Sequence, residues 1–106
     1  MFGKKKNKDL DVGWDLIETL NGKEVEYVVT RNKRSYREKI IGKNGRIALH
    51  GEYLLIICQN SEIFRAQKAT LRAFELMSLN GVTFNIVGND DESIIAYYKY
   101  YLKKSK

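Results

Sequence analysis

Short segments in which apolar and polar residues alternate recur along the chain. Val25, Tyr27 and Val29 alternate with Glu24 and Glu26, whereas the segment 53–58 is apolar at every position. Alternation predicts a strand with one buried face, and a short, wholly apolar run is typical of a central strand covered on both sides. On these patterns we predict seven strands, over residues 23–31, 35–41, 46–51, 53–59, 62–67, 71–79 and 82–87.

The chain contains no proline, so glycine is the main signal for the expected turns. Three glycines follow asparagine, in the pairs Asn21-Gly22, Asn44-Gly45 and Asn80-Gly81. Asn-Gly between apolar runs is a strong hairpin signal, since both residues accept the positive φ of a type I′ turn. The three pairs therefore indicate an antiparallel arrangement.

The C-terminal segment has the pattern of an amphipathic helix. The acidic stretch 89–92 would cap its start, and lysines at 99, 103 and 104 suit the negative end of the helix dipole. Helical spacing gives an apolar stripe wider than one packing contact needs. We therefore predict that one part packs on the sheet while Tyr97, Tyr100 and Tyr101 form a surface for a protein partner or for self-association.

Two segments fit either element. Residues 71–79 are rich in helix formers, but a strand there would pair with 82–87 across Asn80-Gly81, and we favour the strand. Residues 12–20 form either a short helix capped by Asp11 or an additional strand, and we favour the helix.

These elements predict a mainly β (α+β) fold, a seven-stranded antiparallel bent sheet or partly open small barrel with an amphipathic C-terminal helix. With 106 residues, 43% of them hydrophobic, the chain can form one domain with its own core. We expect the domain over 10–103, a disordered basic tail over 1–9 and a frayed tail over 104–106.

Few residues suggest catalysis or metal binding. Cys58 is the only cysteine and His50 the only histidine, too few for a zinc site. The segment 42–46 lacks the spacing of a phosphate-binding loop, and no nucleophile or dinucleotide motif is present. We therefore expect no enzyme activity, no metal and no cofactor. No apolar run approaches the roughly 20 residues of a membrane-spanning helix, and no signal sequence is evident, so we expect a cytoplasmic protein.

Positive charge is concentrated in one internal segment. Residues 31–46 contain seven Lys or Arg and one acidic residue, so this segment carries +6, which equals the net charge of the whole chain. Arginine and lysine at fixed spacing beside a turn can bind phosphates, and Tyr36 among them could stack on a base or lie at a lipid interface. The segment is either a solvated basic rim or an anion-binding surface formed by Arg31, Lys33, Arg34, Arg37 and Lys39, whose ligand is an acidic lipid headgroup, a nucleic acid or a protein partner.

The order of seven strands and one last helix resembles the pleckstrin-homology fold over residues 23–103. Lipid-binding members of that family gather basic residues around the first strand–loop–strand, where this chain has Arg31, Lys33, Arg34 and Arg37. The resemblance implies a non-catalytic binding or adaptor module. The last helix lacks the tryptophan that many members have.

Residues 10–67 also resemble an Sm-like small barrel, through a helix followed by Gly22-Lys23-x-Val25-x-Tyr27-x-Val29. This second resemblance implies RNA binding by an oligomeric ring. The glycine expected midway through the second Sm strand is Glu38 or Lys39 here, and the chain continues beyond the Sm core. A purely structural or assembly role is the third alternative.

Overall fold

The computed structural model describes residues 14–89 and 91–99. A short helix α2 (Trp14–Glu18) is followed by strands β1 (Glu24–Asn32), β2 (Glu38–His50), β3 (Tyr53–Cys58) and β4 (Ser61–Gln67), and then a 3-10 turn η1 (Lys68–Thr70) leads to β5 (Leu71–Glu75), β6 (Gly81–Ile86) and β7 (Glu92–Tyr98). The fold is mainly β, as the sequence predicts.

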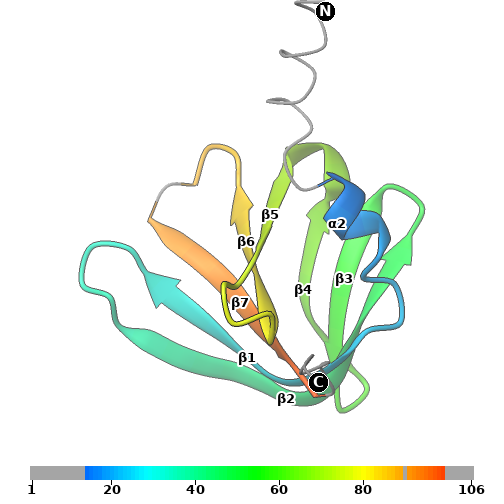
Figure 1. Ribbon diagram of the computed structural model, residues 1–106, viewed down its shortest axis with the longest axis horizontal. Coiled ribbons are helices and arrows are strands. Elements are labelled where there is room, and N and C mark those ends of the chain that lie inside the picture. Colours follow the sequence, from blue (N-terminus) through cyan, green and yellow to red (C-terminus); the bar gives the residue numbers. More distant parts are fainter. Residues whose placement is uncertain (1–13, 90, 100–106) are drawn as a thin grey trace, which may run out of the picture.

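All seven strands form one antiparallel sheet in the order β4-β3-β2-β1-β7-β6-β5. The sheet therefore consists of two meanders, β1 to β4 and β5 to β7, which join where β1 pairs with β7. Figure 1 shows that the sheet curls into a half-barrel, in which its two edge strands, β4 and β5, are linked by η1.

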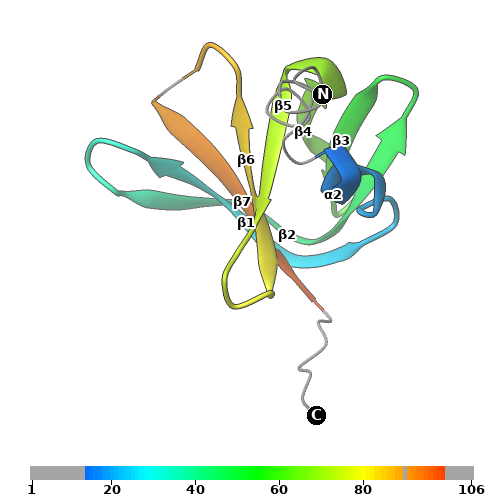
Figure 2. The same cartoon turned by 45° about the horizontal axis from the view of Figure 1, so that its top comes forward.

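The hydrophobic core lies inside this curl and α2 covers its mouth (Figure 2). Ile17 and Leu20 are each only 1% exposed and belong to the core, and α2 packs against β5. Glu18 also pairs with Lys68 of η1, with 3.2 Å between Oε2 and Nζ. The helix favoured over 12–20 is therefore confirmed for Trp14–Glu18, and its predicted cap Asp11 lies outside the described residues. The other large buried side chains of the core are Val25, Val28, Ile47, Leu54, Ile56, Leu71, Val82 and Phe84.

The predicted C-terminal helix is wrong over residues 92–98, which form strand β7. Ile95 pairs with Val29 of β1 and with Thr83 of β6, so β7 lies in the middle of the sheet. Its apolar residues are buried on both faces, and a short, wholly apolar run matches a helix period and a central strand equally well. Tyr100 and Tyr101 lie outside the described residues, as do the two predicted tails.

The predicted strands 35–41 and 46–51 are one continuous strand, β2, rather than two strands joined by a turn. Asn44 does have a positive φ of 54°, but the residues around it stay paired with β1 and β3. Glycine at 45 allows this pairing, because a Cβ there would lie 2.2 Å from the carbonyl oxygen of Ile57. The number of strands is still seven, since β7 replaces the strand lost by this merger.

The other two Asn-Gly pairs also fail to form two-residue hairpins. Asn21-Gly22 joins α2 to β1, and Asn80-Gly81 ends a longer loop after β5. The strand favoured over 71–79 is confirmed only for Leu71–Glu75. The tight turn between β3 and β4 is Gln59-Asn60, whose φ values of 52° and 66° suit a type I′ turn.

Candidate anion-binding site

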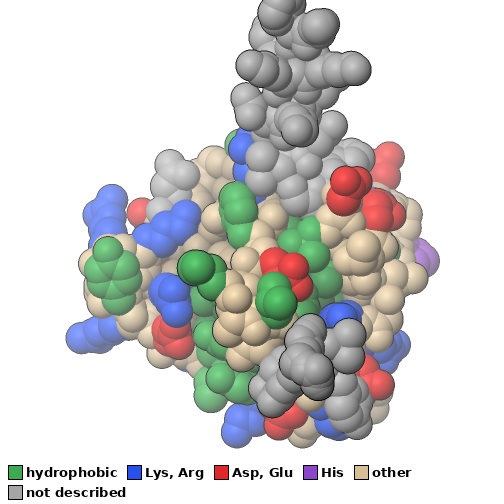
Figure 3. All heavy atoms as spheres, in the orientation of Figure 1, with side chains coloured by type: hydrophobic (Ala, Val, Ile, Leu, Met, Phe, Trp, Pro, Cys, Tyr) green, Lys and Arg blue, Asp and Glu red, His purple; other side chains and the backbone are tan. Residues whose placement is uncertain are grey.

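The basic residues predicted from the sequence lie at the end of the β1–β2 hairpin. We call Arg31, Lys33, Arg34, Arg37 and Lys39 the basic tip. Figure 3 shows Lys and Arg side chains gathered at this end of the molecule, at the left of the view.

The loop of the basic tip is held by hydrogen bonds to Asn32. The side-chain oxygen of Asn32 accepts the backbone N–H groups of Arg34 and Ser35, both at 2.9 Å. Its backbone carbonyl accepts the N–H of Tyr36 at 2.7 Å, and its own N–H donates to the carbonyl of Arg37 at 2.9 Å. Asparagine suits this position because its side chain closes such turns. These bonds order the backbone from which the cations project.

Two of the five cations are paired with carboxylates. Arg31 faces Glu38 across the hairpin and donates from Nε to Oε2 at 2.7 Å. Arg34 lies 3.6 Å from Asp91, measured from Nε to Oδ1. The other three cations, Lys33, Arg37 and Lys39, form no ion pair with any acidic residue among those that the structure describes. They are therefore available to an anion.

The five cations do not share one face of the hairpin. Arg31 pairs with Glu38, whereas Lys39 pairs with Thr30, the neighbour of Arg31. Because successive residues of a strand point to opposite faces, Lys39 lies on the face opposite Arg31. Arg37 precedes β2 and belongs to the loop between the two strands.

A pocket of about 300 Å³ adjoins the basic tip. Lys33 lies on one side and Arg72 of β5 on another, and both side chains are half-buried. None of the described residues that line this pocket is acidic. Sequence reasoning missed Arg72 because only the pairing of β1 with β7, and of β7 with β6, brings β5 near the tip. The remaining lining residues are Asn85, Ile86, Val87, Gly88 and Asn89.

A cross-strand row of polar residues connects this pocket with the basic tip. Arg31 lies opposite Ser93 of β7, and Arg72 lies opposite Asn85 of β6. Ser93 is buried, and its hydroxyl donates to the Asn85 side-chain oxygen at 2.6 Å. This hydrogen bond links the two strand pairs, so that Ser93 and Asn85 lie between the two arginines. With its oxygen held in this way, Asn85 keeps its NH₂ group available as a donor.

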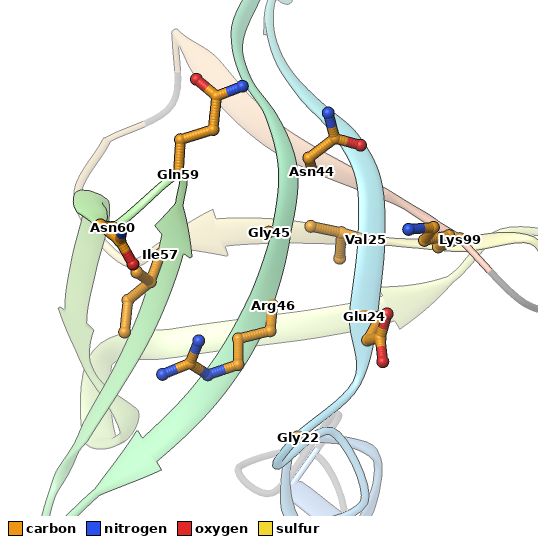
Figure 4. A pocket seen from close by; sticks show the side chains of 10 residues that line it. All are labelled: Gly22, Glu24, Val25, Asn44, Gly45, Arg46, Ile57, Gln59, Asn60 and Lys99. Carbon is orange, nitrogen blue, oxygen red and sulfur yellow. The ribbon is translucent and has the colours of Figure 1, made fainter.

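A second pocket, of about 360 Å³, lies on β1, β2 and β3 at the other end of the sheet (Figure 4). Arg46 lies beside Ile57, and Lys99 lies on the far side of β1 from Arg46. Glu24 pairs with Arg46 across the strands and places a carboxylate in the lining. This carboxylate would oppose an anion, whereas none of the described residues that line the pocket at Lys33 and Arg72 is acidic.

Of the predicted partner-interface residues, only Tyr97 is described. It is half-buried on β7 and stacks on Tyr27 of β1, with ring centroids 4.7 Å apart. Desolvation, with the nearby Glu38 carboxylate as a smaller cause, raises the pKa of Tyr97. The surplus helical face on which the interface was predicted is absent here, because Tyr97 lies in a strand. Its role toward a partner stays a prediction.

Other reactive groups contribute little to a site. Cys58 is buried, and this desolvation raises the pKa of its thiol. Within the described part of the chain, no three His, Cys, Asp or Glu side chains come together to hold a metal ion. No helix in residues 14–89 and 91–99 has the length and apolar character needed to cross a membrane.

Comparison with known proteins gave no match to a family model, to a curated protein or to a solved structure.

Proposed function

We propose that the protein is a non-catalytic binding module that holds an anionic partner against the basic tip. The observation that carries this proposal is the set of three cations, Lys33, Arg37 and Lys39, that lack an ion pair among the described residues. They sit on or beside a loop that Asn32 holds in place. Because the backbone of this loop is already ordered, binding does not have to order it, which favours affinity.

The chemistry of the tip suits charge recognition. Arginine stays protonated throughout the physiological pH range and can contact a phosphate through two N–H groups. Contacts between exposed cations and phosphates are screened by salt, so binding through the tip must weaken as ionic strength rises.

A double variant of the basic tip tests this function. Arg37→Gln with Lys39→Gln removes two cations that form no ion pair among the described residues, so the fold should be unaffected. Lys43→Gln with Arg46→Gln is the matched control, because it removes the same charge from β2 outside the tip. Binding to anionic phospholipid vesicles and to single-stranded RNA is measured at 50 and 200 mM salt (on the order of the range over which such contacts are screened).

We expect the tip variant to bind the preferred anion about tenfold more weakly, which is about 1.4 kcal/mol, and the control to change much less. An equal loss in both variants would show a response to net charge alone, and unchanged binding by the tip variant would remove the proposal.

Single-stranded RNA is a second candidate partner, favoured by Tyr36. This side chain is 76% exposed at the end of the hairpin, between Arg34 and Arg37. Stacking of one base on an aromatic ring contributes about 1–3 kcal/mol. If RNA is the partner, Tyr36→Ala weakens RNA binding while Tyr36→Phe retains it, and light scattering with and without RNA reports whether an oligomer forms.

A further inference from the structure

We propose that the pocket between Lys33 and Arg72 binds the dianionic phosphate of a phosphomonoester. This inference deepens the proposed function, on which it rests, by naming the ligand group and adding a residue, Arg72, that lies outside the basic tip. Lys33 belongs to both, so the pocket extends the tip inward toward β5 and β6.

The first argument is the charge of the lining. Lys33 and Arg72 supply two positive charges, and the pocket has no acidic residue among the described residues that line it. Neither cation has an ion-pair partner in the described part of the chain. Both are half-buried, so water screens them less than it screens the exposed Arg37. Two cations facing one cavity, with no carboxylate among the described lining residues, favour an anion of charge −2.

The second argument is the neutral donor beside them. Asn85 lines the same pocket, and its side-chain oxygen is already occupied by the Ser93 hydroxyl at 2.6 Å. The amide group left over is therefore a donor, which suits an acceptor-only ligand such as phosphate. Arg72 can add two parallel N–H contacts to one phosphate.

The third argument is that backbone hydrogen bonds fix the walls of the pocket. The N–H of Lys33 donates to the carbonyl of Asp91 at 2.8 Å, which ties the basic tip to the β6–β7 turn. The N–H of Val87 donates to the carbonyl of Thr70 at 2.8 Å, and that of Asn89 donates to Ile86 at 2.9 Å. The two cations are thus held on elements that are connected with each other.

These features favour a monoester over a diester. A phosphomonoester has three unsubstituted oxygens and carries close to two negative charges above its second pKa of about 6. A phosphodiester has only two unsubstituted oxygens and one negative charge, so it would leave part of the positive charge of the pocket uncompensated. The pocket should therefore bind more tightly as pH rises from about 5 to about 7.5, as the ligand loses its second proton.

Titrations followed by amide NMR spectra test the pocket. The probes are glycerol 3-phosphate, inorganic phosphate and, as a diester, glycerophosphocholine, at constant ionic strength. We expect glycerol 3-phosphate to shift the amide signals of Gly88 and Arg72 and to bind at least fivefold more tightly than the diester. Arg72→Gln should weaken this binding at least fivefold, whereas Arg46→Gln, an equal change of charge in the second pocket, should change it less than twofold.

Three results would overturn this proposal. The first is that Arg72→Gln keeps the native spectrum and binds glycerol 3-phosphate as tightly as the native protein does. The second is that the largest amide shifts fall at Gln59 and Asn60, and the third is that the diester binds as tightly as glycerol 3-phosphate. If Arg72→Gln fails to give a native spectrum, Lys33→Gln replaces it, and retained phosphate binding in that variant overturns the proposal equally.

Vesicles separate this inference from the proposed function and identify the source of the phosphate. Phosphatidic acid presents a monoester and phosphatidylglycerol presents a diester. Binding of glycerol 3-phosphate together with a preference for phosphatidic acid vesicles assigns the pocket to a lipid headgroup, whereas binding of the soluble ester alone assigns it to a small metabolite. The two proposals can fail separately. If Arg37→Gln with Lys39→Gln loses vesicle or RNA binding but no phosphate binds at Arg72, the proposed function of the basic tip stands and the proposed phosphate pocket is wrong.

Discussion

Ile95 of β7 lies directly opposite Val29 of β1, and the two side chains are only 1% and 2% exposed although neither belongs to the core inside the curl. Their neighbours Ala96 and Val28 pair on the other face and do belong to that core. The sheet therefore buries apolar side chains on both faces along β1 and β7. The outer row continues through Ile40 on β2 and through Thr83 and Phe74 on β6 and β5.

The outer apolar pair should be as important for stability as a core pair. We expect Ile95→Ala to lower the free energy of unfolding by about 3 kcal/mol and Val29→Ala by about 2 kcal/mol, because each leaves a cavity. The double variant should lose less than the sum, since the two side chains are neighbours. Ile40→Ala, at a position 51% exposed, is the control and should cost about 1 kcal/mol or less. Urea unfolding measures all four, and equal losses at positions 95 and 40 would contradict the pairing.

Gly45 should tolerate alanine poorly although it lies in a strand. A Cβ there would lie 2.2 Å from the Ile57 carbonyl oxygen, so β2 and β3 would have to separate. We expect Gly45→Ala to lower stability by about 2–3 kcal/mol. Gly51→Ala is the control, because a Cβ at position 51 meets no atom within 4 Å and only its φ of 61° is unfavourable, which costs about 1 kcal/mol. The ranking is read from urea midpoints, and a smaller loss at 45 than at 51 would refute it.

Stability should fall at high pH because of Tyr98. Burial, with a smaller contribution from Glu75, raises the pKa of this phenol from 10.0 to about 12. Between these values the folded protein keeps a proton that the unfolded chain has lost, so unfolding becomes more favourable as pH rises, by about 1.4 kcal/mol per pH unit at most. Below pH 10 this group contributes no pH dependence. Tyr98→Phe should flatten the stability profile above pH 10 relative to the native protein, and an identical slope in both would contradict the assignment.

Asn32 should affect binding at the basic tip without touching the ligand. Asn32→Ala removes the acceptor of the Arg34 and Ser35 N–H groups, and we expect a loss of stability of about 1 kcal/mol together with weaker anion binding. Asn32→Ser retains a shorter side-chain acceptor and should recover part of both. Thermal unfolding and the vesicle or RNA assay measure the two effects. If Asn32→Ala lowers stability but leaves anion affinity unchanged, the ordered loop is not needed for binding.

The local patterns predicted most of the sheet but could not predict how its strands pair. Alternation at Val25, Tyr27 and Val29 identified β1, and the wholly apolar run at 53–58 identified β3. A similar apolar run at 94–98 was assigned to a helix, because a segment that is apolar at every position fits both the helix period and a strand with two buried faces. The Asn44-Gly45 signal was likewise local, and pairing on both sides of β2 overrode it.

The sequence likewise predicted only the part of the candidate site that is local in the chain. The five cations of the basic tip lie within nine residues of the chain, around one turn, so the sequence alone predicted that they lie together. Arg72 comes near Lys33 only through three successive strand pairings, β1 with β7, β7 with β6 and β6 with β5. No short-range pattern contains that information, and it is the reason that the pocket was not predicted.

The pairing of β1 with β7 also determines when this sheet can be completed during synthesis. The first meander has every residue it needs once β4 has emerged, yet its strand β1 keeps one unpaired edge until residues 92–98 are made. That edge includes Val29, and before β7 is made, water or a strand of another chain can reach this edge. A nascent chain arrested before β7 should therefore be the form most prone to aggregate and most dependent on chaperones.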